Sequence, residues 1–357
     1  MKKTALQGKT TKPIKKSSQP LAAESSNSRI QMVDVARKAG VSAATVSRAL
    51  SGNPSIPEST RNRIAEIAGS MGYRVNHSAA NLRRGQTNVI GVVVLISDTQ
   101  PISDPFILGL IGYIADALNA NGNSMLLTRV STEPRATLQT MVSSGQVSGL
   151  LVIGQTYHQV LNELEIAGIP MVVWGGQLPD TLYSVVGSNN LTGGFLATSH
   201  LLGSGARRIV YLGESKYPEG KLRYSGYVKA LKQYGLKPEK SLHRYCLLSA
   251  TEIEESIHQL LVEGVEFDAI FATSDVGAIR AISALNSHNI KVPSQVKVVG
   301  FDNIPMSAHV QPTLTTINQS IDLAATAMVE LLNEKLTGAA SRSVVLPAVL
   351  IERKSSR

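Results

Sequence analysis

Residues 34–48 read Asp34-Val-Ala-Arg-Lys-Ala-Gly-Val-Ser-Ala-Ala-Thr-Val-Ser-Arg48, and this stretch decides how the N-terminal part of the chain folds. Its first half has apolar residues at helical spacing, and Gly40 then allows a sharp turn out of the helix. Ser42 is a good N-cap for a second helix, which we expect to end at about Leu50. Two short helices joined by so tight a turn predict a helix-turn-helix. The residues expected to face its core are Val35, Ala36, Ala39, Val46, Ala49 and Leu50.

The outer face of the second helix carries side chains that suit DNA. Arginine pairs with guanine O6 and N7, alanine contacts the thymine methyl group, and hydroxyl groups bind phosphates. An ordinary helical hairpin with a solvated face shows the same pattern, so this face alone leaves both interpretations open. The candidate DNA contacts here are Ser42, Ala43, Ala44, Thr45, Ser47 and Arg48.

Charge is distributed unevenly along the 357 residues, whose formal net charge is +9. Residues 1–87 contain 15 lysines and arginines against 4 acidic residues, whereas residues 88–357 contain 20 against 22. A basic head on a nearly neutral body indicates a polyanionic partner at one end. The length is sufficient for two or three domains, and an apolar content of 43% is typical of a globular protein.

Composition also excludes several classes of protein. The longest apolar run, residues 89–96, is too short to cross a membrane and predicts a buried strand. The single cysteine, Cys246, excludes an internal disulfide framework and fits a reducing cytosol. The N-terminal lysines are not followed by an apolar segment, so we expect no secretory signal and no membrane partner. These features favour a cytoplasmic protein.

The chain is expected to divide into four segments. Residues 1–30 are rich in Lys, Ser, Thr and Gln and predict a disordered basic leader, whose lysines either hold DNA phosphates or are merely solvated. Residues 31–75 form the helix-turn-helix DNA-binding domain, in which a third helix starts near Pro57 and ends at Gly72. Residues 76–87 form a polar, basic hinge, and residues 88–357 a two-lobe domain for effector binding and dimerisation.

Residues 31–90 resemble the head and hinge of the LacI (lactose repressor) family of bacterial transcription factors. The resemblance implies DNA contacts at Asn76 and Leu82, because the hinge leucine of that family wedges into the minor groove and bends the DNA. Gln31 and Pro57 replace hydroxyl caps that are frequent in the family, which weakens two helix starts, and Ala80 replaces a hinge arginine. The matching residues are Asp34-Val-Ala36, Ala39-Gly-Val-Ser42, Thr45-Val-Ser-Arg48, Thr60-Arg61, Gly72-Tyr73, Asn76 and Leu82.

From Val89 onward, short apolar runs alternate with helical patterns. Buried strands that alternate with helices predict parallel sheets covered on both faces, and some 270 residues favour two such sheets. The expected fold is therefore an all-α helix-turn-helix head followed by an α/β body. The resemblance implies a periplasmic-binding-protein-like body, with residues 88–204 and 320–344 in the first lobe and residues 205–319 plus the tail in the second. The clearest apolar runs are residues 89–96, 149–153, 170–174, 207–212, 268–272 and 296–301.

Polar and aromatic residues follow the expected strands, and in open parallel sheets ligands bind at the carboxyl ends of strands. Asp, Asn, Arg and Gln beside few aromatic rings suit a polyhydroxylated ligand. Two candidates have structural alternatives, because Asp275 also suits a helix cap and Trp174 also suits the core. The candidate effector contacts are Asp104, Phe106, Trp174, Asn189, Thr192, Arg223, Asp275, Asp302 and Gln319; the family resemblance supports Asp104, Phe106, Arg223, Asp302 and Gln319.

Rival functions fit the sequence less well. No nucleophile elbow, zinc-protease motif or P-loop is present, so we expect neither an enzyme nor a cofactor or metal. A secreted sugar-binding protein would share the two-lobe fold but would need an export signal. The expected function is a repressor that a carbohydrate inducer releases from double-stranded operator DNA, with a purine-type corepressor as the alternative. A leucine-rich tail that would favour a tetramer is absent, so a homodimer is expected.

Overall fold

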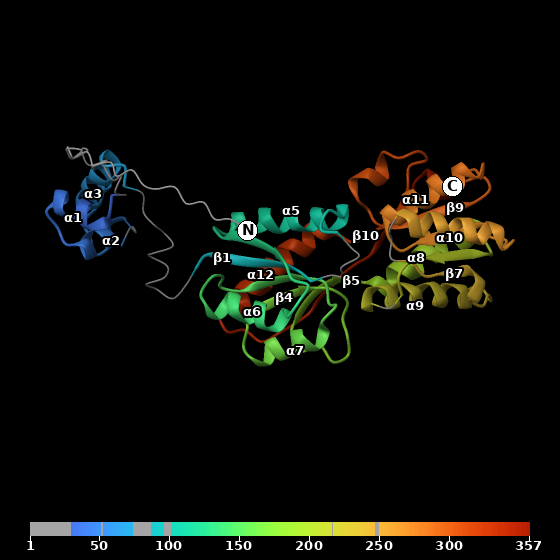
Figure 1. Cartoon of the computed structure of the whole chain (residues 1–357), viewed down its shortest axis with the longest axis horizontal. Helices are drawn as coiled ribbons and strands as arrows, with labels where there is room; N and C mark the ends of the chain where they lie inside the picture. Colours follow the sequence, from blue (N-terminus) through green and yellow to red (C-terminus); the bar gives the residue numbers. More distant parts are fainter. Residues whose placement is uncertain (1–29, 51–52, 74–86, 96–100, 216, 247–249) are drawn as a thin grey trace, which may run out of the picture. The chain divides into compact units, whose positions relative to one another are not determined.

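The computed structural model describes residues 30–50, 53–73, 87–95, 101–215, 217–246 and 250–357. The chain divides into two compact units, which meet in the sequence at His77 and Ser78 (Figure 1). Each unit is built around its own apolar core. In the residues that the structure describes, the first unit holds three helices, and the second holds two six-stranded sheets with their covering helices.

The first unit, the head, is a bundle of three helices. They are α1 (Met32–Ala39), α2 (Ala43–Leu50) and α3 (Glu58–Ser70). Gly40 ends α1 with a φ of 65°, a conformation that costs glycine little, so α2 can start at Ala43 with only two residues in between. The predicted helix-turn-helix is confirmed, although Leu50 is only half-buried. The buried core comprises Val35, Ala36, Ala39, Val46, Ala49, Ile64 and Ala68.

The helix starts differ in how they are capped. The backbone N–H of Gln31 donates to the Asp34 carboxylate at 3.0 Å, so Asp34 stabilises the start of α1 in place of a hydroxyl cap. At α2 the backbone N–H of Thr45 donates to Ser42 Oγ at 3.1 Å, as expected for an N-cap. Pro57 precedes α3 without any side-chain cap. The weak helix start expected from the missing hydroxyl cap is therefore found at α3 but not at α1.

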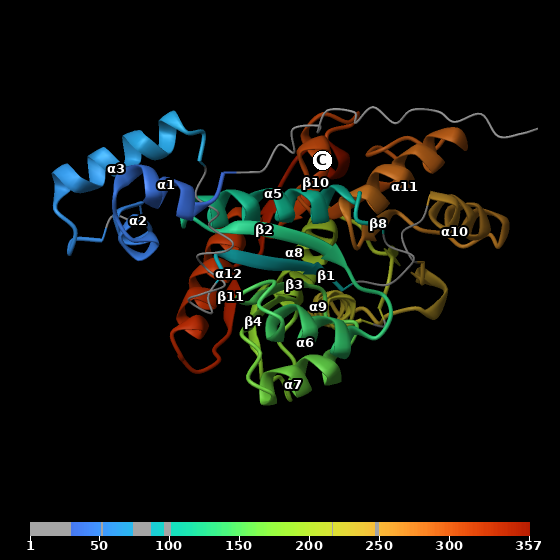
Figure 2. The same cartoon turned by 60° about the vertical axis from the view of Figure 1, so that its left-hand side comes forward.

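The first sheet of the body has the strand order β11–β5–β4–β3–β1–β2, and every pair in it is parallel. Helices α5 (Pro105–Ala120) and α12 (Ile321–Leu336) pack on one face. Helices α6 (Pro134–Ser143) and α7 (His158–Ile166) pack on the other (Figure 2). The strands are β1 (Val89–Val94), β2 (Ser124–Arg129), β3 (Leu150–Ile153), β4 (Met171–Trp174), β5 (Ser184–Ser188) and β11 (Val344–Leu346).

The second sheet has the order β12–β10–β9–β8–β6–β7, and only the pair of β10 with β12 is antiparallel. Helices α8 (Asn190–Gly203) and α9 (Pro218–Gln233) pack on one face. Helices α10 (Ala250–Val262) and α11 (Asp275–Ser287) pack on the other. The strands are β6 (Ile209–Leu212), β7 (His243–Arg244), β8 (Ala269–Ala272), β9 (Lys297–Asp302), β10 (Thr315–Asn318) and β12 (Val349–Ile351); three short 3₁₀ helices span Lys240–Leu242, Pro305–Ala308 and Lys354–Ser356.

The chain passes between the two sheets three times, after β5, after β10 and after β11. The expected lobe boundary at Ser204 is wrong, because α8 packs on α9 and on β9 of the second sheet. The first crossing therefore lies at Asn189, one helix earlier than the sequence suggested. This places the carboxyl ends of β3, β4, β8 and β9 and the start of α9 around one cavity.

The head's small core provides a test of its fold. Ile64 is fully buried on α3, and we expect Ile64→Ala to destabilise the head by about 2–5 kcal/mol, since it leaves a cavity among short helices. Chemical unfolding followed by circular dichroism measures this loss. The matched change Glu66→Ala on the exposed side of α3 should cost less than about 0.5 kcal/mol. Equal losses in both variants would contradict the assigned core.

Candidate functional site

The outer face of α2 is open to solvent in the head. Ser42, Ala44 and Arg48 are exposed, while Val46 and Ala49 on the opposite side are buried. The Arg48 Nε–H donates to the Ala44 carbonyl oxygen at 3.3 Å, so the side chain lies along the exposed face of the helix. Of the remaining candidates, Ala43, Thr45 and Ser47 are half-buried, and Asn76 and Leu82 lie outside the described residues.

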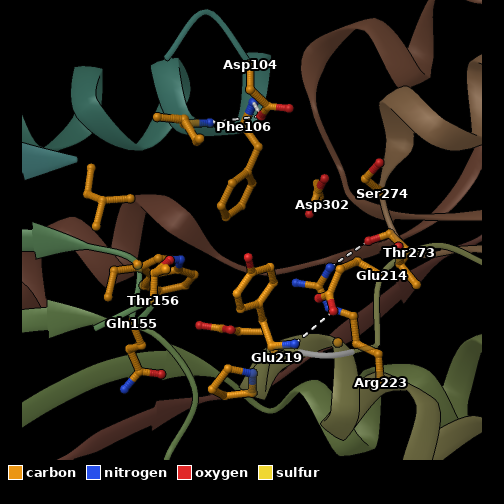
Figure 3. A pocket seen from close by; sticks show the side chains of 17 residues that line it. Asp104, Phe106, Gln155, Thr156, Glu214, Glu219, Arg223, Thr273, Ser274 and Asp302 are labelled. Atoms are coloured by element: carbon orange, nitrogen blue, oxygen red, sulfur yellow. Dashed lines mark hydrogen bonds between the residues drawn. The ribbon is translucent and has the colours of Figure 1, made fainter. Parts of the chain in front are cut away.

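The body contains a cavity of about 180 Å³ that is lined from both sheets (Figure 3). Asp104, Phe106 and Trp174 line it from the first sheet and its helices, and Arg223 and Asp302 line it from the second. These five were predicted from the sequence as effector contacts. They come together because parallel strands place their carboxyl ends, and the loops that follow, at one edge of each sheet.

Two aromatic rings form one wall of the cavity. The centroids of Phe106 and Trp174 lie 6.0 Å apart with an interplanar angle of 45°. Trp174 also packs in the core of the first sheet and is only 7% exposed, so both interpretations of this residue apply to it. A ring pair of this kind can cover the apolar face of a sugar or stack on a planar base.

Arg223 is held in a fixed position on the second-sheet side. Its Nε–H donates to Asn190 Oδ1 at 2.8 Å, and its Nη1–H donates to the Thr273 carbonyl oxygen at 2.6 Å. Its Cζ atom lies 3.9 Å from the centroid of the Phe301 ring, which adds a cation–π contact. The guanidinium is therefore oriented by three protein groups before any ligand arrives.

Asp302 ends β9 with a φ of 122° and is 7% exposed. Gln319 Nε2 donates to Asp302 Oδ1 at 2.7 Å, so Gln319 orients this carboxylate from behind. Burial raises the pKa of Asp302 well above its usual range; the Arg223 charge opposes this shift, and the charges of Asp275 and Asp104 add to it. Such a carboxylate gains most from a ligand group that donates to it.

Asp104 faces the cavity from the start of α5. Its Oδ1 accepts from the backbone N–H groups of Phe106 at 3.0 Å and Ile107 at 3.3 Å, and it therefore caps the helix. Burial raises the pKa of Asp104 despite these two hydrogen bonds. Asp104 thus caps α5 through Oδ1, and the same side chain also lines the cavity.

Asn189 and Thr192 do not line the cavity. The Asn189 side chain accepts from the Thr192 backbone N–H at 3.0 Å and caps α8. The packing of α8 on the second sheet explains this placement, because the helix starts where the chain leaves the first sheet. Their predicted effector contacts are therefore not supported by the geometry.

Asp275 lies behind the cavity wall rather than in it. Its carboxylate accepts from the Ile304 N–H at 2.9 Å and from the Thr316 hydroxyl group, and Gly300 leaves the space that its Oδ1 occupies. Burial raises the pKa of Asp275 to about 7. The N-cap of α11 is Ser274, not Asp275. Asp275 thus ties the start of α11 to β10 and the loop after β9, a structural role close to the helix-cap alternative.

Several lining residues were not predicted from the sequence. They lie directly after strands or in the first turn of α9, and the strand-end rule could have found those after β3 and β8. Glu219 has no comparable signal, since it lies within a helical pattern. Its Oε1 and Gln155 Oε1 accept from the same Gly176 N–H, at 3.2 and 2.8 Å. The unpredicted lining residues with polar side chains are Gln155, Thr156, Glu214, Tyr217, Glu219, Thr273 and Ser274.

The part of the chain that the structure describes shows no cluster of three or more His, Cys, Asp or Glu side chains able to hold a metal ion. In the same residues, no helix is both long enough and apolar enough to cross a membrane.

Comparisons with known proteins match both units. The family model of bacterial regulatory proteins of the lacI family matches residues 31–76, and that of the periplasmic binding protein-like domain matches residues 198–356. The HTH-type transcriptional regulator CelR of Thermobifida fusca is 30% identical over 328 residues, which cover 90% of this chain and 96% of that protein. The HTH-type transcriptional repressor PurR of Histophilus somni (strain 2336) is 28% identical over 333 residues, which cover 90% of this chain and 97% of that protein.

The fold is also similar to a solved structure. A complex of the transcriptional regulator CelR with cellobiose superimposes with a TM-score of 0.69 and 28% sequence identity. The similarity covers 92% of this chain and 100% of that one. It therefore extends beyond either unit alone.

The crowded carboxylates of the cavity predict a pH-dependent stability. We expect Asp302→Asn, which keeps an acceptor for Gln319 and removes one buried charge, to stabilise the unliganded body by about 1 kcal/mol near neutral pH. Thermal unfolding of both proteins at several pH values measures this. A melting temperature of the variant below that of the unmodified protein would contradict the assigned environment of Asp302.

The sign of the pH dependence follows from the raised pKa values. Between the ordinary pKa of 3.8 and the raised pKa, which is about 7 for Asp275, the folded protein binds more protons than the unfolded chain. The stabilisation from these two groups is therefore complete below the ordinary pKa and is lost as the pH rises through the raised one. Asp302→Asn should make this loss smaller.

Proposed function

The chain belongs to the LacI family of bacterial regulatory proteins and is thus a DNA-binding transcriptional regulator, and we propose that a small carbohydrate releases it from an operator that it represses. The observation that carries the carbohydrate assignment is the cavity, in which a fixed guanidinium and a buried carboxylate lie opposite an aromatic wall. Hydroxyl groups donate to the Asp302 carboxylate and accept from the Arg223 guanidinium. The apolar face of a sugar ring fits against Phe106.

A relative supports this choice of ligand class. The CelR structure that superimposes on this chain is a complex with cellobiose, a disaccharide. The runner-up is a purine-type corepressor, which two observations favour: the relative named as the repressor PurR, and the pair of rings at Phe106 and Trp174. The acidic character of the lining supports the sugar, because a purine offers fewer donors to satisfy carboxylates.

The mechanism requires two conformations of the body with different affinities for the effector. The cavity is lined from both lobes, so a ligand that bridges Asp104 and Arg223 favours one arrangement of the lobes over another. An effector that stabilises the arrangement in which the heads of a dimer no longer match the two half-sites acts as an inducer. This mechanism uses binding alone and no chemical step, so the proposed function is not enzymatic.

We place the homodimer contact on α5 and the adjacent edge strand β2. Leu108 and Tyr113 on α5 and Leu127 on β2 are exposed apolar side chains on elements that pack together. A single helix-turn-helix reads too few base pairs for specificity, so the function requires two heads and a pseudo-palindromic operator. The proposal also places the protein in the cytoplasm, where its DNA is.

Arg48 tests base recognition. Because Arg48 lies on the exposed face of α2, we expect Arg48→Ala to cost about 1–3 kcal/mol of operator affinity and to relax discrimination at one position in each half-site. Binding titrations against the operator and against every single-base variant of it measure both effects. A uniform loss on operator and random DNA would instead make Arg48 a phosphate contact.

Arg223 tests the link between cavity and operator. We expect Arg223→Ala to abolish the effector response while operator binding without effector stays within about twofold, because the residue lies in the body and not in the head. The affinity of the unmodified protein for sugar should fall by about 5–150-fold when operator DNA is bound, since coupling between two sites is reciprocal. Calorimetric titration of a carbohydrate panel with and without operator measures the coupling.

The same titration separates the alternatives. Equal sugar affinities with and without operator would refute induction even if a sugar binds well. Tighter binding in the presence of operator would make the ligand a corepressor.

A further inference from the structure

The cavity has an unbalanced charge. Of the described residues that line it, four carry carboxylates and one, Arg223, carries a basic group. Asp104 lines it from the first lobe and Asp302 from the second, and Glu214 and Glu219 lie below them in the view of Figure 3. Hydroxyl groups of a neutral sugar satisfy the hydrogen bonding of such a lining but leave its charge unchanged.

Arg223 compensates this charge only in part. Its two hydrogen bonds go to neutral oxygens, those of the Asn190 side chain and the Thr273 backbone, and its planar face lies on Phe301. Its positive charge lowers the pKa of both Asp302 and Glu219, yet burial keeps both values raised. One guanidinium is thus shared between the buried carboxylate of Asp302 and the half-buried carboxylate of Glu219.

Asp104 and Asp302 are the two aspartates that line the cavity, one from each lobe. Asp104 comes from the start of α5 in the first lobe and Asp302 from the end of β9 in the second, and the Asp104 charge raises the pKa of Asp302. In each residue Oδ1 takes the hydrogen bonds from the described residues, from Phe106 and Ile107 in one and Gln319 in the other. The side chain of Asp302 is more than nine-tenths buried, yet it lines the cavity. A ligand in the cavity can donate to its second carboxylate oxygen.

We propose that the effector is an amino sugar, whose protonated amine binds between Asp104 and Asp302. This inference rests on the proposed function and narrows its ligand class. An ammonium group has three donors and one positive charge, so it satisfies both carboxylates and removes their mutual repulsion. The rings of Phe106 and Trp174 line the same cavity and add a favourable surface for a cation.

The position of the two carboxylates gives the amine a role in signalling. Since Asp104 belongs to the first lobe and Asp302 to the second, an ammonium between them favours the conformation in which the lobes are closest. Without the ammonium, the Asp104 charge raises the pKa of Asp302, and the charges of Arg280 on Asp104 and of Arg223 on Asp302 offset the effect of burial only in part, since both pKa values stay raised. A neutral analogue therefore binds the same cavity with less bias toward the closed arrangement.

Matched pairs of ligands test the charge directly. The probes are glucosamine with glucose, galactosamine with galactose, and the glucosamine disaccharide with cellobiose, titrated by calorimetry at about pH 6.5, where the amine is protonated. We expect the amino member of at least one pair to bind about tenfold or more tightly than its neutral partner. The corresponding N-acetylated sugar, which has no charge on nitrogen, should lose this advantage.

Asp104→Asn tests the location of the charge. Asparagine caps a helix as well as aspartate does, so α5 keeps its start while the cavity loses one carboxylate. We expect the ratio of neutral-sugar to amino-sugar dissociation constants to fall about tenfold in this variant. The control Asp322→Asn makes the same change at an exposed position in the first turn of α12 and should leave the ratio unchanged.

Each remaining outcome overturns a defined part of the argument. If a neutral sugar releases the operator and its amino partner binds no better, the amine is refuted while the carbohydrate effector stands. If no sugar of either kind binds, the proposed function fails together with this inference. If putrescine, an aliphatic diamine, binds as tightly as the best amino sugar, a cation site is present but the ligand class is wrong.

Discussion

The buried carboxylate of Asp302 sets the conditions for the rest of the cavity. It lies at the end of a central strand, more than nine-tenths buried, with Asp275 behind it and Asp104 across from it. Two nearby groups favour this charge: Gln319 donates to it directly, and the charge of Arg223 lowers its pKa. A protein that only needed a stable fold would gain by replacing such a residue with a neutral one, and this supports the binding role that we propose for Asp302.

How well the sequence predicted each part depended on the range of the interactions that determine it. The head could be predicted almost completely, because a local pattern in about twenty residues determines its first two helices and a glycine turn separates them. The lobe of α8 could not be, because the residues from 190 to 203 are apolar enough to cover either sheet. The packing of α8 against α9 and against β9, which is distant in the sequence, determines that α8 belongs to the second lobe. Edge strand β2 was missed for a related reason, since its residues are only partly buried and form no apolar run.

The candidate site shows the same division between local and distant information. Sequence position after a strand was enough to find Trp174, and for Asp104, Arg223 and Asp302 the resemblance to the family supported the same prediction. Position could not separate Asp275 from Asp302, since both are acidic residues that follow apolar strands. The difference is three-dimensional: Asp275 receives hydrogen bonds from Ile304 and Thr316 and is closed off from the cavity.

The contacts at Gly176 connect this site to the movement that regulation requires. The Gly176 N–H donates both to Gln155, in the first lobe, and to Glu219, in the second, so one donor is shared between a contact within a lobe and a contact between lobes. Loss of the Glu219 contact leaves this N–H satisfied by Gln155, which lowers the cost of separating the lobes. Opening also exposes the Glu219 carboxylate to water. Because burial raises the pKa of Glu219, exposure to water stabilises its charged form. The cavity thus gains solvation when it opens and needs a ligand's donors to hold it closed, and this is the dependence on ligand that a switch requires.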